Sequence, residues 1–119
     1  METYQQVLAD LREPTRSLRH AIPSTWAGFL SLHQSAMGEG AVPTRLKEVV
    51  AMTIAAVQHC DGCIGYHAKA AARAGATAEE VAEILGVALL MDGGPGSVYA
   101  PKAWQAFLEF QAAEAGAPA

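Results

Sequence analysis

Two cysteines and a histidine stand close together in the stretch HCDGCIGYH, residues 59–67. Cys60 and Cys63 are the only cysteines of the chain, and His67 follows Cys63 by four residues. In a reducing compartment a C-x-x-C pair stays a dithiol until something oxidises it, so it indicates redox or metal chemistry more readily than a structural cross-link. A spacing of four places His67 one helical turn from Cys63, where its imidazole can accept the thiol proton.

The Asp-Gly pair between the cysteines interrupts the helical pattern, so we expect a helix to begin here with Cys60 and Cys63 in its first turn. Unpaired backbone N–H groups and the helix dipole favour a thiolate at such a position. Because His67 lies on the same helix face as Cys63, we predict that Cys63 is the attacking thiolate and Cys60 its partner.

Glu48 lies on the preceding expected helix, at the edge of its apolar run, and can orient His67. The result is a carboxylate–imidazole–thiol chain of the kind that activates nucleophiles. A thiolate that attacks a peroxide becomes a sulfenic acid, and a second thiol within reach condenses with it to a disulfide. An external dithiol must then reduce the pair, so this chemistry requires a redox partner.

The spacing of these residues resembles a known family. Glu48 is followed by eleven residues, then Cys60-x-x-Cys63, then three residues and His67. This order resembles the E-x11-C-x-x-C-x3-H pattern of the alkylhydroperoxidase D-like branch of the carboxymuconolactone decarboxylase family. The flanking stretches LKEVVAMTIAAV, GYHAKAAARAGATAEEVAEIL and GGPGSVYAPKAW are also similar, and the likeness covers roughly residues 22–110.

This resemblance implies an all-α fold that assembles as trimers or hexamers, and a peroxiredoxin-type alkyl hydroperoxide reductase as the activity. It implies a peroxidatic Cys63, a resolving Cys60 and a proton relay through Glu48 and His67, with no cofactor or metal. One position departs from the pattern. Gly62 stands where the best-characterised peroxidase of the family carries a histidine, whereas His59 lies on the other side of the pair.

Other interpretations of the same residues stay open. The cysteines can be buried packing residues, or can hold zinc together with His67 and Glu48. Within the same family, a lactone decarboxylase would not need the thiols. A non-enzymatic redox sensor, a different class of protein, would form the disulfide without turnover.

Several further side chains admit both a structural and a functional interpretation. His33 shares an apolar stripe with Trp26, Phe29, Leu30 and Met37, a setting more typical of a core histidine than of a catalyst. Tyr66 can line a substrate site or simply pack, whereas we expect the aromatic residues of the C-terminal part to belong to the core or to a subunit interface: Tyr99, Trp104 and Phe107.

The elements that must position these residues are all helical. Apolar residues recur with helical periodicity along nearly the whole chain, and no strand-like alternation appears, so we predict a single-domain, all-α bundle of about six helices over residues 1–119, with the motif core at 44–92. The expected helix signals are an end or bend at Pro14, N-caps at Ser24 and Thr44, and a capping box formed by residues 77–80. The run VVAMTIAAV, residues 49–57, is apolar on every side and predicts a helix at the centre of the assembly. We expect the C-terminal EAGAPA to fray.

Composition narrows the possible partners. Apolar residues make up 51% of the 119-residue chain and charged residues 17%, a balance that leaves apolar surface for contact with other copies, so we expect a homo-oligomer. A net charge of −4 with scattered basic residues argues against nucleic acid. The N-terminal sequence lacks a signal-peptide pattern and no segment is apolar enough to span a membrane, so we expect a cytoplasmic protein.

Overall fold

The computed structural model describes residues 2–116. It contains six α-helices: α1 (Tyr4–Ala21), α2 (Pro23–Met37), α3 (Thr44–Val57), α4 (Asp61–Arg73), α5 (Ala78–Asp92) and α6 (Gly96–Ala115). The described residues include no strand, so the predicted all-α bundle of about six helices is confirmed. The last three residues of the segment expected to fray lie outside the described part of the chain.

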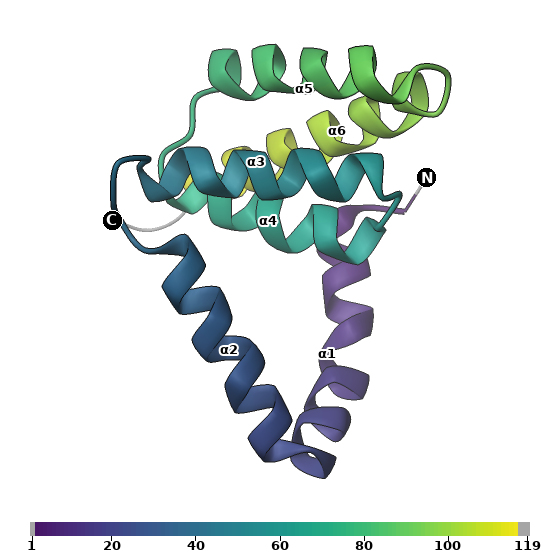
Figure 1. Ribbon diagram of the computed structural model, residues 1–119. Helices are drawn as coiled ribbons and strands as arrows, with labels where there is room; N and C mark the ends of the chain where they lie inside the picture. Colours follow the sequence, from purple (N-terminus) through teal and green to yellow (C-terminus); the bar gives the residue numbers. More distant parts are fainter. Residues whose placement is uncertain (1, 117–119) are drawn as a thin grey trace.

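Helices α3, α4, α5 and α6 form the body of the molecule, and α1 and α2 project from it as two arms that meet at their shared junction (Figure 1). The N-terminal end of α1 packs on the body, where Tyr4 and Leu8 join the core. The largest fully buried side chains come from four helices of the body: Phe107, Met52, Ile64, Val49 and Val81. This core holds α3 and α4 together, and with them every residue of the predicted motif.

Local capping explains where two helices of the body begin. The Thr77 hydroxyl accepts a hydrogen bond from the Glu80 N–H, and the Glu80 carboxylate accepts one from the Thr77 N–H, so the predicted capping box is confirmed. Helix α4 begins directly after Cys60, whose sulfur accepts a hydrogen bond from the Cys63 N–H. The two cysteines therefore lie at the N-terminus of a helix, as predicted, with Cys60 at the N-cap just outside it.

In the arms, the helix end considered at Pro14 does not occur, and the N-cap predicted at Ser24 is wrong. Helix α1 continues through Pro14, which is exposed, so water can reach the Asp10 carbonyl that loses its helical partner. Helix α2 begins at Pro23 after Ile22 rather than after Ser24, because a proline is well suited to the first helical position and needs no N–H partner there. The next helix likewise begins at Thr44 itself, with Pro43 before it.

Within one chain, residues 49–57 are not buried on every side. Val49, Met52, Ala55 and Ala56 are buried, but Val50, Ile54 and Val57 are between 37% and 51% exposed. All of α2 is described, and none of its residues is buried. The apolar surface expected from the composition therefore lies on α2, on the outer face of α3 and on α5. Within the described residues, no helix has the length and apolar character needed to cross a membrane.

Candidate active site

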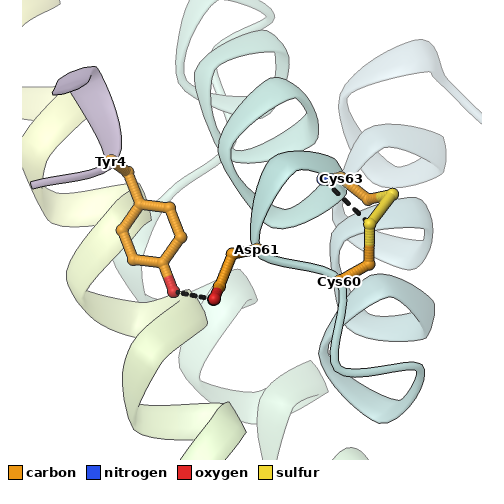
Figure 2. The surroundings of a disulfide bond; sticks show 4 residues. All are labelled: Tyr4, Cys60, Asp61 and Cys63. Atoms are coloured by element: carbon orange, nitrogen blue, oxygen red, sulfur yellow. Dashed lines mark hydrogen bonds between the residues drawn. A yellow bond between two sulfur atoms is a disulfide. The ribbon is translucent and has the colours of Figure 1, made fainter. Parts of the chain in front are cut away.

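The turn between α3 and α4 brings the two cysteines into covalent contact. A disulfide joins Cys60 to Cys63, with 5.2 Å between their Cα atoms (Figure 2). The Cys60 sulfur lies 3.2 Å from the Cys63 amide nitrogen, which donates a hydrogen bond to it. Two cysteines placed in this way are within reach of each other for thiol–disulfide chemistry.

The two sulfurs have different surroundings. Cys60 caps the helix, where a backbone N–H can stabilise negative charge on its sulfur. Cys63, on the first turn of α4, lines a cavity that also contains His67 and Glu48. Only Cys63 is therefore placed where a molecule in that cavity can reach it beside the imidazole and the carboxylate.

Glu48 and His67 form a hydrogen-bonded pair between α3 and α4. Glu48 Oε1 lies 3.3 Å from His67 Nδ1, and the Glu48 side chain is buried. An ionised carboxylate can only accept, so Nδ1 carries the proton of this hydrogen bond and Nε2 is left with the lone pair of a base. A buried carboxylate needs such a partner, because burial without one is costly. The structure thus brings together all four residues singled out by the sequence.

The cavity beside Cys63 has a volume of about 450 Å³ and lies between the α2 arm and the body. Its lining is mostly apolar and comes from α1, α2, α3 and α4: Thr15, Trp26, Phe29, Leu30, His33, Glu48, Cys63, Tyr66, His67 and Ala70. Tyr66, for which both interpretations stood open, lines this cavity with 46% of its surface exposed. Trp26, Phe29 and Leu30 of the His33 stripe all line the cavity, so a molecule bound there would contact apolar side chains of α2.

His33 is the site residue that the sequence interpretation missed. The interpretation as a core histidine is wrong, since His33 is exposed and its ring lies 6.1 Å from that of His67, nearly parallel to it. The apolar stripe on α2 was the one feature of the sequence that could have identified His33 as a site residue. The stripe marks one face of the helix correctly, but that face lines a cavity and does not pack in the core.

On the opposite side of the α4 N-terminus, Asp61 points away from the disulfide and towards Tyr4 (Figure 2). The Tyr4 hydroxyl donates to Asp61 at 2.8 Å, and Lys102 Nζ lies 3.0 Å from the same carboxylate. Burial acts to raise the pKa of Asp61, but the hydrogen bonds from Lys102 and Tyr4 outweigh it and hold that pKa below its usual value. Burial, followed by the hydrogen bond to Asp61, raises the pKa of Tyr4 well above its usual range. These contacts fix the start of α4, and with it the position of Cys63.

His59 precedes the cysteine pair in a left-handed backbone conformation, with φ of 57°. Its ring stacks on Tyr99 with 4.3 Å between centroids, and its Nε2 lies 3.2 Å from Asp92 Oδ2. Tyr99 and Trp104 pack against the core and Phe107 is fully buried, in agreement with the core interpretation of these aromatics. The contacts of His59 on α5 and α6 hold the chain in the turn that leads into Cys60.

Comparison with known proteins supports the relationship suggested by the motif. The chain is similar to the solved structure of a carboxymuconolactone decarboxylase family protein from Legionella pneumophila, with a TM-score of 0.87 and 38% sequence identity. The match covers 91% of this chain and 96% of that protein's chain. A Thermotoga maritima member of that family, described with a possible role in antioxidative response, has a TM-score of 0.74 and 25% identity, covering 89% of this chain and 93% of its own.

Relatives of unknown function show the same likeness in sequence. An uncharacterised protein from Cupriavidus necator is 34% identical over 81% of this chain and 85% of its own length. A second, uncharacterised protein 4 of the cox locus of Paracoccus denitrificans, is 39% identical over 63% of this chain and 68% of its own. The model of the carboxymuconolactone decarboxylase family matches residues 23–114. The chain therefore belongs to the carboxymuconolactone decarboxylase family.

Proposed function

We propose that the protein is a thiol-dependent peroxidase that reduces hydroperoxides, with Cys63 as the nucleophile and Cys60 as the resolving thiol. The observation that carries this proposal is the position of Cys63: it is within bonding reach of Cys60 and lines the cavity that holds the paired Glu48 and His67. Membership of a family with a member linked to an antioxidative response agrees with it.

The reaction follows from the positions of these groups. His67 accepts the Cys63 proton, and the thiolate attacks the terminal oxygen of the hydroperoxide, the one that carries hydrogen, so that the O–O bond breaks and an alkoxide departs. Cys63 becomes a sulfenic acid, and the departing alkoxide takes the proton from His67 and leaves as an alcohol. The Cys60 thiol then displaces water from the sulfenic acid and forms the disulfide.

Glu48 acts by orienting His67 and by stabilising the imidazolium that forms when the proton leaves Cys63. The separation of 3.3 Å and the burial of the carboxylate favour this role, because an ion pair is stronger where water is excluded. Two electrons from an external dithiol return the pair to its reduced form by thiol–disulfide exchange. A protein or small-molecule dithiol is accordingly the redox partner that we propose.

The cavity favours an organic hydroperoxide over hydrogen peroxide. Trp26, Phe29 and Leu30 supply apolar surface to its wall on α2, which can bind the organic part of the substrate. A carboxylated lactone is a poorer match. None of the described residues that line this cavity is Lys or Arg, and the buried Glu48 carboxylate would repel an anionic substrate.

We also propose that the protein is a homo-oligomer. Phe29 and Leu32 on α2 and Leu90 and Met91 on α5 are each more than half exposed. A second copy of the chain can cover this surface. Light scattering coupled to size-exclusion chromatography tests the proposal, and a monomer at micromolar concentration would contradict it.

The experiment that tests the peroxidase is a free-thiol count on reduced, chelator-treated protein before and after one equivalent of cumene hydroperoxide. We expect the wild type to lose both thiols, and Cys60→Ser to accumulate a sulfenic acid at Cys63 that dimedone traps. Cys63→Ser, the matched control, should keep its remaining thiol and show no trapped product.

Turnover with excess dithiol then separates an enzyme from a sensor. Continuous consumption of hydroperoxide supports the peroxidase, whereas a single round of disulfide formation contradicts it. Survival of both thiols in the wild type would exclude the redox mechanism and leave the decarboxylase as the function to test.

A further inference from the structure

We propose that His33, Glu48 and His67 form a binding site for a divalent transition-metal ion of the zinc type. Each residue offers one ligand atom, and these atoms all lie within 4.8 Å of one another. The three side chains come from α2, α3 and α4, so the fold itself converges them on one point. All three line the cavity beside Cys63.

The chemistry of this set matches that of known metal centres. Two imidazoles and one carboxylate are the protein ligands of many zinc and non-haem iron sites, in which the remaining coordination positions stay open to water or substrate. Here the open side of the set is the cavity, which is large enough to admit such a molecule.

Burial of Glu48 adds a second argument. Only 3% of its surface is exposed, and its charge is compensated by a hydrogen bond of 3.3 Å from the His67 ring. A divalent cation would replace the proton that His67 Nδ1 shares with Glu48 and would compensate the carboxylate more fully. His33, nearly stacked on His67 at 6.1 Å, is already on the correct side to supply the third ligand atom.

This site differs from a zinc site built on the cysteines. None of its ligands is a thiolate, and the three residues converge while Cys60 and Cys63 are joined in a disulfide. Metal binding is therefore expected in both redox states. An ion bound to His67 would also prevent that imidazole from transferring protons. This consequence rests on the proposed function, but the metal site itself does not.

The ion would also change the stability of the α2 arm. Helix α2 has no buried residue, and His33 would tie it to α3 and α4 through the metal. Because the ion binds the folded chain and cross-links three helices, it should raise the midpoint of thermal unfolding in a concentration-dependent manner.

The test uses the full-length Cys60→Ser/Cys63→Ser protein, stripped with a chelator, so that neither thiols nor peroxidase activity can influence the result. Zn²⁺ binding is measured by equilibrium dialysis near neutral pH, and Co²⁺ serves as the spectroscopic probe. We expect about one ion per chain, visible Co²⁺ absorption typical of nitrogen and oxygen ligands, and a higher thermal midpoint. His33→Ala should weaken Zn²⁺ binding at least tenfold, and Glu48→Gln should do the same.

His20→Ala is the matched control, since His20 is an exposed histidine on α1 outside the cavity. It should leave both the affinity and the Co²⁺ spectrum unchanged. Loss of binding in the double cysteine variant would overturn the proposal and place the metal on the thiols. Equal weakening by His20→Ala and His33→Ala, or no effect of His33→Ala, would overturn it in favour of non-specific surface binding.

Discussion

Leu11 on α1 covers Gly62, the residue between the two cysteines: a β-carbon at position 62 would lie 2.9 Å from Leu11 Cδ1. This contact gives a structural reason for glycine at a position where the best-characterised peroxidase of the family has histidine. The N-terminal half of α1 lies against α4 and takes the space that a larger side chain would need. In the mechanism that we propose, proton transfer at Cys63 therefore relies on His67, which lines the same cavity as Cys63.

The same packing predicts different costs for two glycines of α4. A β-carbon at Gly65 would meet Leu8 Cδ2 at 2.9 Å and Cγ at 3.2 Å, and Leu8 is buried, whereas at Gly62 it meets only the end of the Leu11 side chain. Gly65→Ala should therefore lower the free energy of unfolding by about 1–3 kcal/mol, as overpacking does. Gly62→Ala should cost less than about 1 kcal/mol, because the Leu11 tip can move and alanine favours the helix.

Gly86 provides the control for these two substitutions. It is exposed on α5, and nothing lies within 4 Å of an added β-carbon. Gly86→Ala should stabilise the protein by about 0.5–1 kcal/mol in urea titrations, since only helix propensity changes. A loss of stability for Gly65→Ala no larger than that for Gly62→Ala would contradict the packing argument.

The sequence was most informative where local chemistry decides the outcome. The capping box at Thr77 and the start of α4 beside the cysteines depend on residues a few positions apart, and both predictions are confirmed. The Glu48–His67 pair joins two helices, yet the sequence still indicated it, because the motif fixes the spacing across the α3–α4 turn.

Predictions failed where the partner of a helix face decides the outcome. The apolar periodicity of α2 is the same whether its face packs in a core or lines a cavity, so it could not place His33 correctly. The run at residues 49–57 is apolar on all sides, but the chain covers only one side of α3, so burial of Val50 and Ile54 would depend on other copies of the chain. Pro14 does not end the helix, one of the two outcomes considered for it, because it is exposed and water can replace the lost hydrogen bond.

Glu48→Gln tests the proton relay without a change in side-chain size. It replaces the carboxylate 3.3 Å from His67 by a neutral amide, which orients the ring less firmly and does not stabilise an imidazolium. We expect the rate of thiol oxidation by an organic hydroperoxide to fall about 10²-fold or more, the range typical of lost acid–base assistance. Stopped-flow measurements with a chelator present give this rate.

Glu83→Gln is the matched control, because Glu83 is an exposed carboxylate on α5 away from the cavity. Its rate should equal that of the wild type. Unchanged rates in both variants, with helicity preserved, would mean that Glu48 has only a structural role.

The contact between Tyr4 and Asp61 predicts how stability depends on pH. The pKa of Asp61 is lowered, so its contribution is present above the ordinary value of 3.8 and is lost as the pH falls through the folded-state pKa. The pKa of Tyr4 is raised, so its contribution is present below the ordinary value of 10.0 and is lost as the pH rises through its folded-state pKa. Stability should therefore decline below about pH 4 and above about pH 10.

Tyr4→Phe should remove the Tyr4 component of the alkaline decline and reduce the acid one, because Asp61 loses one of its donors. Near neutral pH it should cost about 1 kcal/mol, the usual net value of one hydrogen bond. Urea titrations across the pH range measure both effects. Tyr66→Phe, at an exposed position, is the control and should leave the pH profile of stability unchanged. An identical profile for wild type and Tyr4→Phe would show that the Tyr4–Asp61 hydrogen bond does not contribute to stability.

His59 allows backbone strain to be separated from side-chain contacts. Its φ of 57° is unfavourable for any residue with a β-carbon, whereas glycine adopts it freely. His59→Gly and His59→Ala both remove the Tyr99 stack and the Asp92 contact, so their difference reports the strain. We expect the glycine variant to be about 1 kcal/mol more stable than the alanine variant in urea titrations.

The neighbouring Gln58, where φ is −82°, provides the control. There the order of stability should reverse, because alanine fits the right-handed region at lower entropic cost than glycine. The same order at both positions would mean that the turn into Cys60 is not held in the left-handed conformation in solution.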